Sequence, residues 1–133
     1  MKILLDTHVI IWALTDDPRL SKAARIAITD PANTIYYSLA SIWEIAIKNA
    51  KAPEKCPYNE KEISDLCDRS GFLPLDITLD HICGLRELKA KNELSNHDPF
   101  DRLLISQAKS DNMKLFSHDT NFDNYDEKCI YKI

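Results

Sequence analysis

Residues 2–14 read KILLDTHVIIWAL. The first four of these residues form a short apolar run that ends at Asp6, which is typical of a buried β-strand. The apolar residues at 8–14 predict a helix that ends near Asp17 and Pro18. A buried strand that leads directly into a helix is how an α/β fold begins, and Asp6 falls at the strand end, where such folds place their sites.

The rest of the chain continues this alternation. Helices are predicted over 22–30, 40–51, 59–69, 78–90 and 99–111, and further strands over 34–37, 72–77, 114–117 and 129–133. Pro74 favours a sheet edge for its strand, because proline cannot donate a ladder hydrogen bond. We therefore expect an α/β fold with a mostly parallel sheet.

Length and composition narrow the class of protein. The 133 residues fit one domain, 1–133, and the net charge is −4, from 17 basic and 21 acidic residues. The chain therefore lacks the general excess of basic residues that is typical of nucleic-acid-binding proteins. Because it has only two glycines, it cannot form a glycine-rich phosphate-binding loop. The four cysteines form no CxxC pair, and no apolar run is long enough for a membrane span. We expect a cytoplasmic protein without a membrane association.

Acidic residues gather at the predicted element ends. Asp6 and Asp119 follow strands, Asp98 and Asp101 begin a helix, and Glu44 lies in the first turns of another helix. Two unit charges 5 Å apart repel by roughly 3 kcal/mol at an effective dielectric near 20. Four carboxylates in one pocket therefore need neutralisation, which hard divalent cations such as Mg²⁺ and Mn²⁺ provide through oxygen ligands.

Each acid also has a purely structural interpretation. Asp6 and Asp98 could cap the helices that follow them, and Asp119 could be a turn residue. Glu44 could complete a capping box with Ser41. It could also form an ordinary surface ion pair with Lys48, four residues further along the helix. The residues alone leave these alternatives open.

Four motifs together resemble the PIN-domain ribonucleases of the VapC-type toxin group. They are LLDTHVIIWAL (4–14), SLASIWEIAIK (38–48), HDPFDRLLISQA (97–108) and LFSHDTNF (115–122). Each motif is weak by itself, but their order and spacing cover nearly the whole chain. The resemblance implies a PIN-like, three-layer α/β/α fold with a central, mostly parallel sheet of four to five strands.

The resemblance also implies which residues form the site. The acids that would bind one or two Mg²⁺ or Mn²⁺ ions, here called the acidic quartet, are Asp6, Glu44, Asp101 and Asp119. Asp98 is a second candidate for the third position. Thr7 and Ser117 match hydroxyl positions beside the site in similar proteins. Lys48 and Arg102 are candidates for contacts with RNA phosphates.

The activity implied is a metal-dependent endoribonuclease that uses a metal-activated water and leaves 5′-phosphate and 3′-hydroxyl ends. Similar proteins are toxins of toxin–antitoxin pairs, form homodimers, and are held inactive by a cognate antitoxin. Two alternatives stay open: a catalytically inactive PIN-like scaffold that only binds partners, and a phosphatase of the haloacid-dehalogenase type. The phosphatase chemistry needs a second Asp two residues after Asp6, where this chain has His8.

Overall fold

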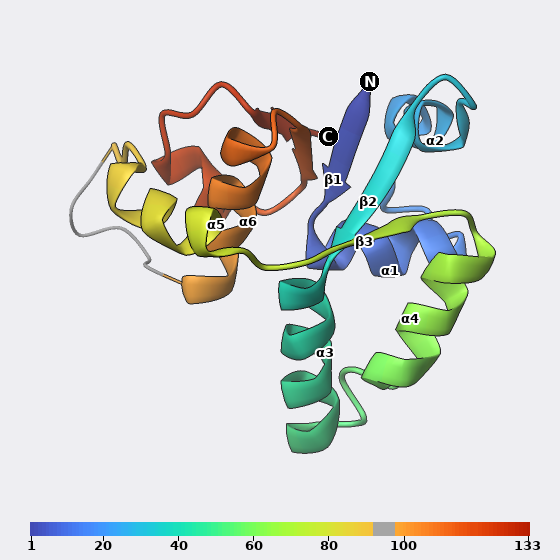
Figure 1. Ribbon diagram of the computed structural model, residues 1–133. Coiled ribbons are helices and arrows are strands. Elements are labelled where there is room, and N and C mark those ends of the chain that lie inside the picture. Colours follow the sequence, from blue (N-terminus) through green and yellow to red (C-terminus); the bar gives the residue numbers. More distant parts are fainter. Residues whose placement is uncertain (92–97) are drawn as a thin grey trace.

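The computed structural model describes residues 1–91 and 98–133, and its centre is a five-stranded sheet in the order β3-β2-β1-β4-β5 (Figure 1). All four pairs of neighbouring strands in this sheet are parallel. The strands are β1 (Lys2–Leu5), β2 (Thr34–Ser38), β3 (Leu73–Leu75), β4 (Lys114–Ser117) and β5 (Ile130–Lys132). The predicted α/β sheet is confirmed, with Pro74 in an edge strand.

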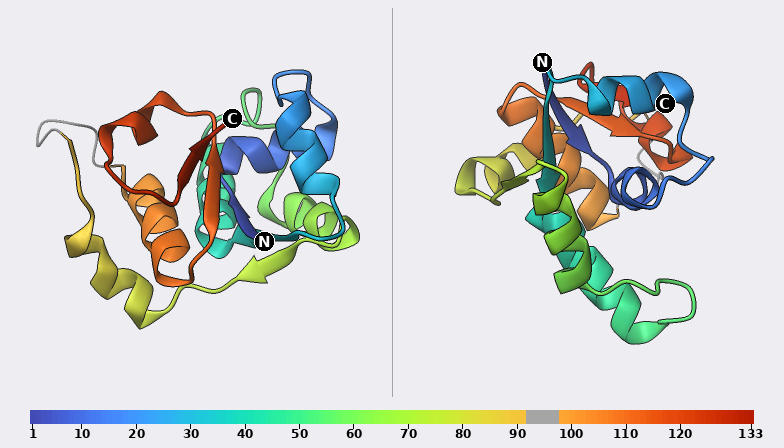
Figure 2. Two further views of the ribbon diagram at one scale, coloured as in Figure 1. Left: turned by 90° about the horizontal axis from the view of Figure 1, so that it is seen from above. Right: turned by 90° about the vertical axis from the view of Figure 1, so that its right-hand side faces the viewer.

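Helices cover both faces of the sheet (Figure 2). They are α1 (Thr7–Thr15), α2 (Lys22–Thr29), α3 (Leu39–Lys51), α4 (Glu60–Arg69), α5 (Leu79–Cys83) and α6 (Pro99–Ser110), with short 3₁₀ helices η1 (Gly84–Glu87) and η2 (Thr120–Asn124). Ile3 and Leu5 pack into one core with α1, α2 and α4, whereas Leu4 packs into a second core with α6. Because successive side chains of a strand point to opposite faces of the sheet, β1 contributes to both cores.

The α3 helix leaves the carboxyl end of β2 and packs against α1, α4 and α6 (Figure 1). Its N-cap is Ser38, whose hydroxyl oxygen accepts a 3.0 Å hydrogen bond from the Ala40 N–H. The interpretation of Ser41 and Glu44 as a capping box is therefore wrong, because the helix begins one turn earlier than that box requires. Glu44 lies within the second turn of α3, where its side chain is free to face the sheet end.

The predicted helix over 78–90 is also wrong in its length. The α-helix ends at Cys83, continues as η1, and Ala90 then forms an isolated antiparallel bridge with Tyr125. The change to a 3₁₀ helix falls at Gly84, which packs so closely on α6 that an added Cβ would meet the Ser106 hydroxyl oxygen at 2.8 Å. Residues 92–97, between the predicted helices 78–90 and 99–111, lie outside the described residues.

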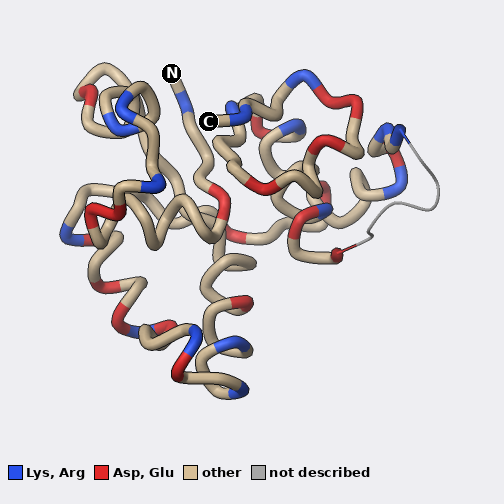
Figure 3. Tube along the Cα trace, turned by 180° about the vertical axis from the view of Figure 1, so that it is seen from behind, with Lys and Arg blue, Asp and Glu red and all other residues tan. Residues whose placement is uncertain are grey.

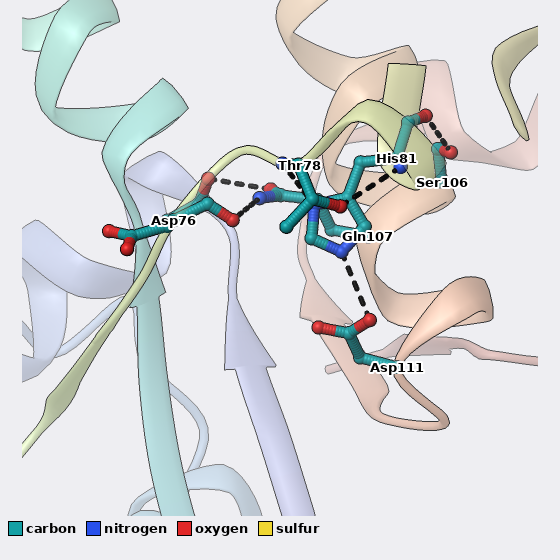
Figure 4. A network of polar contacts seen from close by, with 7 residues as sticks. Asp76, Thr78, His81, Ser106, Gln107 and Asp111 are labelled. Carbon is teal, nitrogen blue, oxygen red and sulfur yellow. Dashed lines mark hydrogen bonds and ion pairs between the residues drawn. The ribbon is translucent and has the colours of Figure 1, made fainter. Parts of the chain in front are cut away.

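A buried polar network joins α5 to α6 and centres on His81 (Figure 4). The His81 side chain is fully buried, and its Nδ1 accepts a 3.1 Å hydrogen bond from the Thr78 N–H. Nε2 therefore carries the proton and donates to Asp111 Oδ1 at 3.0 Å. Ser106 donates to the His81 carbonyl, and Gln107 donates to the Asp76 carbonyl at 3.3 Å. These contacts tie α5 and the segment before it to α6.

We predict that His81→Leu lowers the free energy of unfolding by about 2 kcal/mol, because the Thr78 N–H and the Asp111 carboxylate lose their partner. Urea denaturation of the two proteins measures this difference. The control is Ile82→Ser on the same helix, an exposed position where we expect a change within about 0.5 kcal/mol. Equal stability of His81→Leu and the parent protein would show that the network contributes nothing.

Candidate active site

Asp6 lies at the carboxyl end of β1 and is 3% exposed. Its Oδ1 accepts a 2.6 Å hydrogen bond from the Thr7 N–H, and its Oδ2 accepts a 3.0 Å hydrogen bond from the Ser117 hydroxyl. The structure makes Asp6 the N-cap of α1. Capping uses only one of its two oxygens, so the cap interpretation does not compete with a role of the other oxygen in a site.

Glu44 is held from two sides although it lies on a different helix. The Thr7 hydroxyl donates a 2.8 Å hydrogen bond to Glu44 Oε1, and Thr7 Oγ1 also lies 2.9 Å from Ser41 Oγ. Glu44 Oε2 forms a 2.6 Å ion pair with Lys48 Nζ, as the spacing of four residues predicts. Because Thr7 directly follows Asp6 in the sequence, its hydrogen bond to Glu44 holds the Glu44 carboxylate close to Asp6.

Asp119 follows β4 and begins η2, where its Oδ1 accepts a 2.9 Å hydrogen bond from the Asn121 N–H. Its backbone N–H donates to the Ser117 hydroxyl oxygen at 3.1 Å. Ser117 is buried, and it therefore connects the backbone of Asp119 to the carboxylate of Asp6. Both hydroxyl residues that sequence motifs place beside the site, Thr7 and Ser117, contact carboxylates of the acidic quartet.

Asp98 and Asp101 differ sharply in what their side chains do. Asp98 is the N-cap of α6, and its Oδ1 accepts hydrogen bonds of 2.8 Å from the Phe100 N–H and 3.3 Å from the Asp101 N–H. Asp101 is only 8% exposed, and its carboxylate has no hydrogen-bond or ion-pair partner in the described part of the chain. A buried carboxylate without a partner is costly, so Asp101 is the acid that most needs a ligand.

Burial and mutual repulsion dominate the electrostatics of these acids. Burial, together with the negative charges of Asp98, Asp6, Asp119 and Glu44, raises the pKa of Asp101 to about 8. Burial likewise raises the pKa of Asp6 to about 7, although its hydrogen bonds from Ser117 and Thr7 oppose the shift. Asp6 and Asp101 therefore each lie in the negative field of other acids of the quartet.

The donor chemistry of this cluster fits a hard divalent cation. All four side chains offer carboxylate oxygens, and the unpartnered Asp101 lies among them. As the side chains stand, however, no group of three or more Asp, Glu, His and Cys residues in the described ranges is arranged to hold a metal ion. Some of these carboxylates must therefore turn before they can share one ion.

Sequence reasoning missed how α3 and α6 are fixed relative to each other. Trp43 precedes Glu44 on α3, and Phe100 precedes Asp101 on α6. The two aromatic rings pack edge to face, with 5.1 Å between their centroids. The Ser38 hydroxyl donates a 2.6 Å hydrogen bond to the buried Gln107 Oε1. The signal in the sequence was a polar Gln inside the apolar run of α6.

The two basic candidates for RNA contacts lie in different surroundings. Lys48 pairs with Glu44, and its side chain is 49% exposed. Arg102 Nη2 instead donates a 2.9 Å hydrogen bond to the Leu85 carbonyl of η1. Arg102 forms no ion pair with a carboxylate in residues 1–91 and 98–133. The structure therefore brings Lys48, but not Arg102, into contact with the quartet.

A family model for the PIN domain matches residues 3–128. The chain belongs to the PIN domain family. This membership agrees with the parallel sheet, its helical layers and the acids at the carboxyl ends of its strands. No curated protein matches the chain.

Several solved structures share this PIN-domain fold. VapBC2 from Rickettsia felis, bound to a DNA fragment of its promoter, has a TM-score of 0.70 and 17% identity, with 99% of this chain and 98% of that chain covered. VapBC-1 from Haemophilus influenzae has a TM-score of 0.63, 17% identity, and coverage of 93% and 92%. Mycobacterium tuberculosis VapC20, a sarcin–ricin loop cleaving toxin, has a TM-score of 0.58, 15% identity, and coverage of 94% and 97%. At these identities the likeness shows the fold.

The raised carboxyl pKa values predict a pH dependence of the metal-free protein. A carboxyl whose folded pKa lies above its unfolded value stabilises the fold most at low pH, and this contribution is lost as pH rises through the folded pKa. The loss runs from about pH 4 to about pH 7 for Asp6 and to about pH 8 for Asp101. We therefore expect Asp101→Asn to be more stable than the parent at pH 8.5, with the advantage shrinking at pH 5.

Thermal unfolding in EDTA at the two pH values measures this difference, which we expect to reach roughly 5 °C at pH 8.5. Glu54→Gln, at an exposed position outside the site, is the matched control and should show no such pH-dependent gain. If Asp101→Asn were less stable than the parent at pH 8.5, the excess negative charge at this site would be refuted.

Proposed function

We propose that this PIN domain is a metal-dependent endoribonuclease whose acidic quartet binds Mg²⁺ or Mn²⁺. The observation that supports this most is Asp101, a buried carboxylate without a partner among the described residues, surrounded by other acids at the carboxyl ends of β1 and β4. A purely structural acid at this position would cost stability with no return. Groups with such strongly shifted pKa values concentrate at functional sites.

Mg²⁺ or Mn²⁺, when bound, supplies the Lewis acidity and positive charge that phosphodiester hydrolysis needs. The chain's own residues provide the rest. The Ser117 hydroxyl orients the Asp6 carboxylate, and the Thr7 hydroxyl orients the Glu44 carboxylate. A carboxylate of the quartet accepts the proton of the attacking water. Lys48 is the basic side chain at the rim that can meet an RNA phosphate.

We further propose that the protein is the toxin of a toxin–antitoxin pair in the cytoplasm. Support comes from its fold, which it shares with the VapBC2 and VapBC-1 proteins and with a toxin–antitoxin complex from Klebsiella pneumoniae. No helix in the described ranges is long and apolar enough to cross a bilayer. On α3, the exposed apolar residues Leu39, Trp43 and Ile47 recur at every fourth position, which favours a protein partner such as an antitoxin or a second copy.

We expect RNA cleavage to require a divalent metal. Protein treated with EDTA should not cut RNA, and added Mg²⁺ or Mn²⁺ should restore cutting. Asp6→Asn removes one charge from the quartet but keeps nearly the same shape, so it should fold and be inactive. Gel analysis of cleaved RNA, with circular dichroism as the folding check, tests both statements. Full activity in EDTA would overturn the metal-dependent mechanism.

The two acids at the start of α6 should separate by role. Serine is also a good N-cap, so Asp98→Ser should keep the free energy of unfolding within about 1 kcal/mol and retain substantial nuclease activity. Asp101→Ser removes the unpartnered carboxylate and should abolish cleavage at saturating Mn²⁺. The opposite pattern, an inactive Asp98→Ser and an active Asp101→Ser, would assign the third position of the quartet to Asp98.

A further inference from the structure

Both oxygens of the Glu44 carboxylate are already occupied in this structure. Oε1 accepts the 2.8 Å hydrogen bond from the Thr7 hydroxyl, and Oε2 forms the 2.6 Å ion pair with Lys48 Nζ. Glu44 itself is 8% exposed. Each oxygen keeps a second lone pair, as the oxygens of the hydrogen-bonded Asp6 carboxylate do, but a cation at Oε2 would meet the positive charge of the Lys48 ammonium.

Lys48 is the partner that can leave. Thr7 is 2% exposed, lies in the first turn of α1, and is also within 2.9 Å of the Ser41 hydroxyl. Lys48 is a long side chain on the outer part of α3, and it is 49% exposed. Because the Lys48 side chain reaches solvent, its ammonium can exchange Glu44 for water without any movement of the backbone.

The Lys48 charge acts on more than its immediate partner. Its ammonium also interacts with the carboxylates of Asp98 and Asp6, so it lies within the field of the whole acidic cluster. Figure 3 shows this arrangement along α3, with an acidic position near the sheet followed by basic positions farther out. Lys48 thus supplies, from within the chain, part of the positive charge that the carboxylates need.

We propose that Lys48 is a built-in counter-ion that competes with the divalent cation for Glu44. This inference rests on the proposed metal-dependent function and adds a regulatory step to it. In the metal-free protein, the ammonium neutralises Glu44 and limits the repulsion among the acids. Cation binding displaces the ammonium into solvent, where it is free to contact an RNA phosphate. Metal loading would thereby release a phosphate-binding group at the same site.

The test is the dissociation constant for Mn²⁺ of RNA-free protein, measured by calorimetry. We expect Lys48→Met to bind Mn²⁺ about tenfold more tightly, because a unit positive charge no longer competes for or repels the cation. Lys48→Arg keeps the charge and should bind as the parent does. Lys51→Met removes an exposed lysine one turn farther along α3 and is the matched control, with unchanged affinity expected.

A double-mutant cycle with Glu44→Gln tests the competition directly. If Lys48 acts through Glu44, Lys48→Met should have much less effect on Mn²⁺ affinity in the Glu44→Gln background. The parent protein supplies a second readout that needs no substitution at Lys48: after reductive ¹³C-methylation of its lysines, the Lys48 signal should move on addition of Mg²⁺, and the Lys51 signal should not.

The outcomes separate this inference from the function on which it rests. Parent protein that binds neither Mn²⁺ nor Mg²⁺ would overturn the proposed function as well. Suppose that the parent binds Mn²⁺, that Lys48→Met binds it equally or more weakly, and that the Lys48 signal does not move. This result would overturn only the competition between Lys48 and the cation. Tighter binding by Lys48→Met that persists fully with Glu44→Gln would also refute it, because the effect would then not run through Glu44.

Discussion

Burial of like charges at the carboxyl ends of β1 and β4 is the constraint around which the rest of the site is arranged. Asp6 and Asp101 are 3% and 8% exposed, and each feels the charges of the other acids. A fold gains nothing from repulsion of this kind, and single domains are stable by only about 5–15 kcal/mol. The surrounding structure must therefore hold the acids where they are.

Two hydroxyl groups do much of this holding. The Ser117 hydroxyl donates to Asp6 and accepts from the backbone N–H of Asp119, and the Thr7 hydroxyl donates to Glu44. The backbone N–H of Thr7 also donates to Asp6, which caps α1. These bonds stabilise ionised carboxylates and fix their directions, because an acceptor-only group gains from every donor aimed at it. Asp101 has no such donor in the described ranges, so the stabilisation of the quartet is uneven.

The fold was largely predictable because its signals are local. The apolar run before Asp6 and the alternation of strands with helices indicate a parallel α/β sheet directly. The errors lie where elements meet. The α-helix α5 gives way to a 3₁₀ helix at Gly84, which packs closely on Ser106 of α6, and α3 begins at Leu39 because Ser38, at the end of β2, caps it. In sequence, Ser38 and Ser41 are equally good caps, and only the register of β2 distinguishes them.

The sequence proposes the residues of the candidate site but does not indicate their contacts. Four motifs pointed to the acids, yet helix spacing alone makes Glu44 and Lys48 an ordinary surface pair. Only the fold shows that Glu44 is 8% exposed and that Thr7 reaches it from α1. Contacts between residues 37 positions apart depend on how α1 and α3 pack, which local sequence does not encode.

The same contacts bear on whether this PIN domain is an enzyme or only a scaffold. A buried acid without a partner lowers the stability of a fold. A protein that is only a scaffold would gain stability if this acid were replaced or paired. Asp98, three residues earlier, is paired with two backbone N–H groups and shows that α6 can satisfy an acid at its start. Asp101 is left unsatisfied beside it, which supports the proposal that its carboxylate binds a cation.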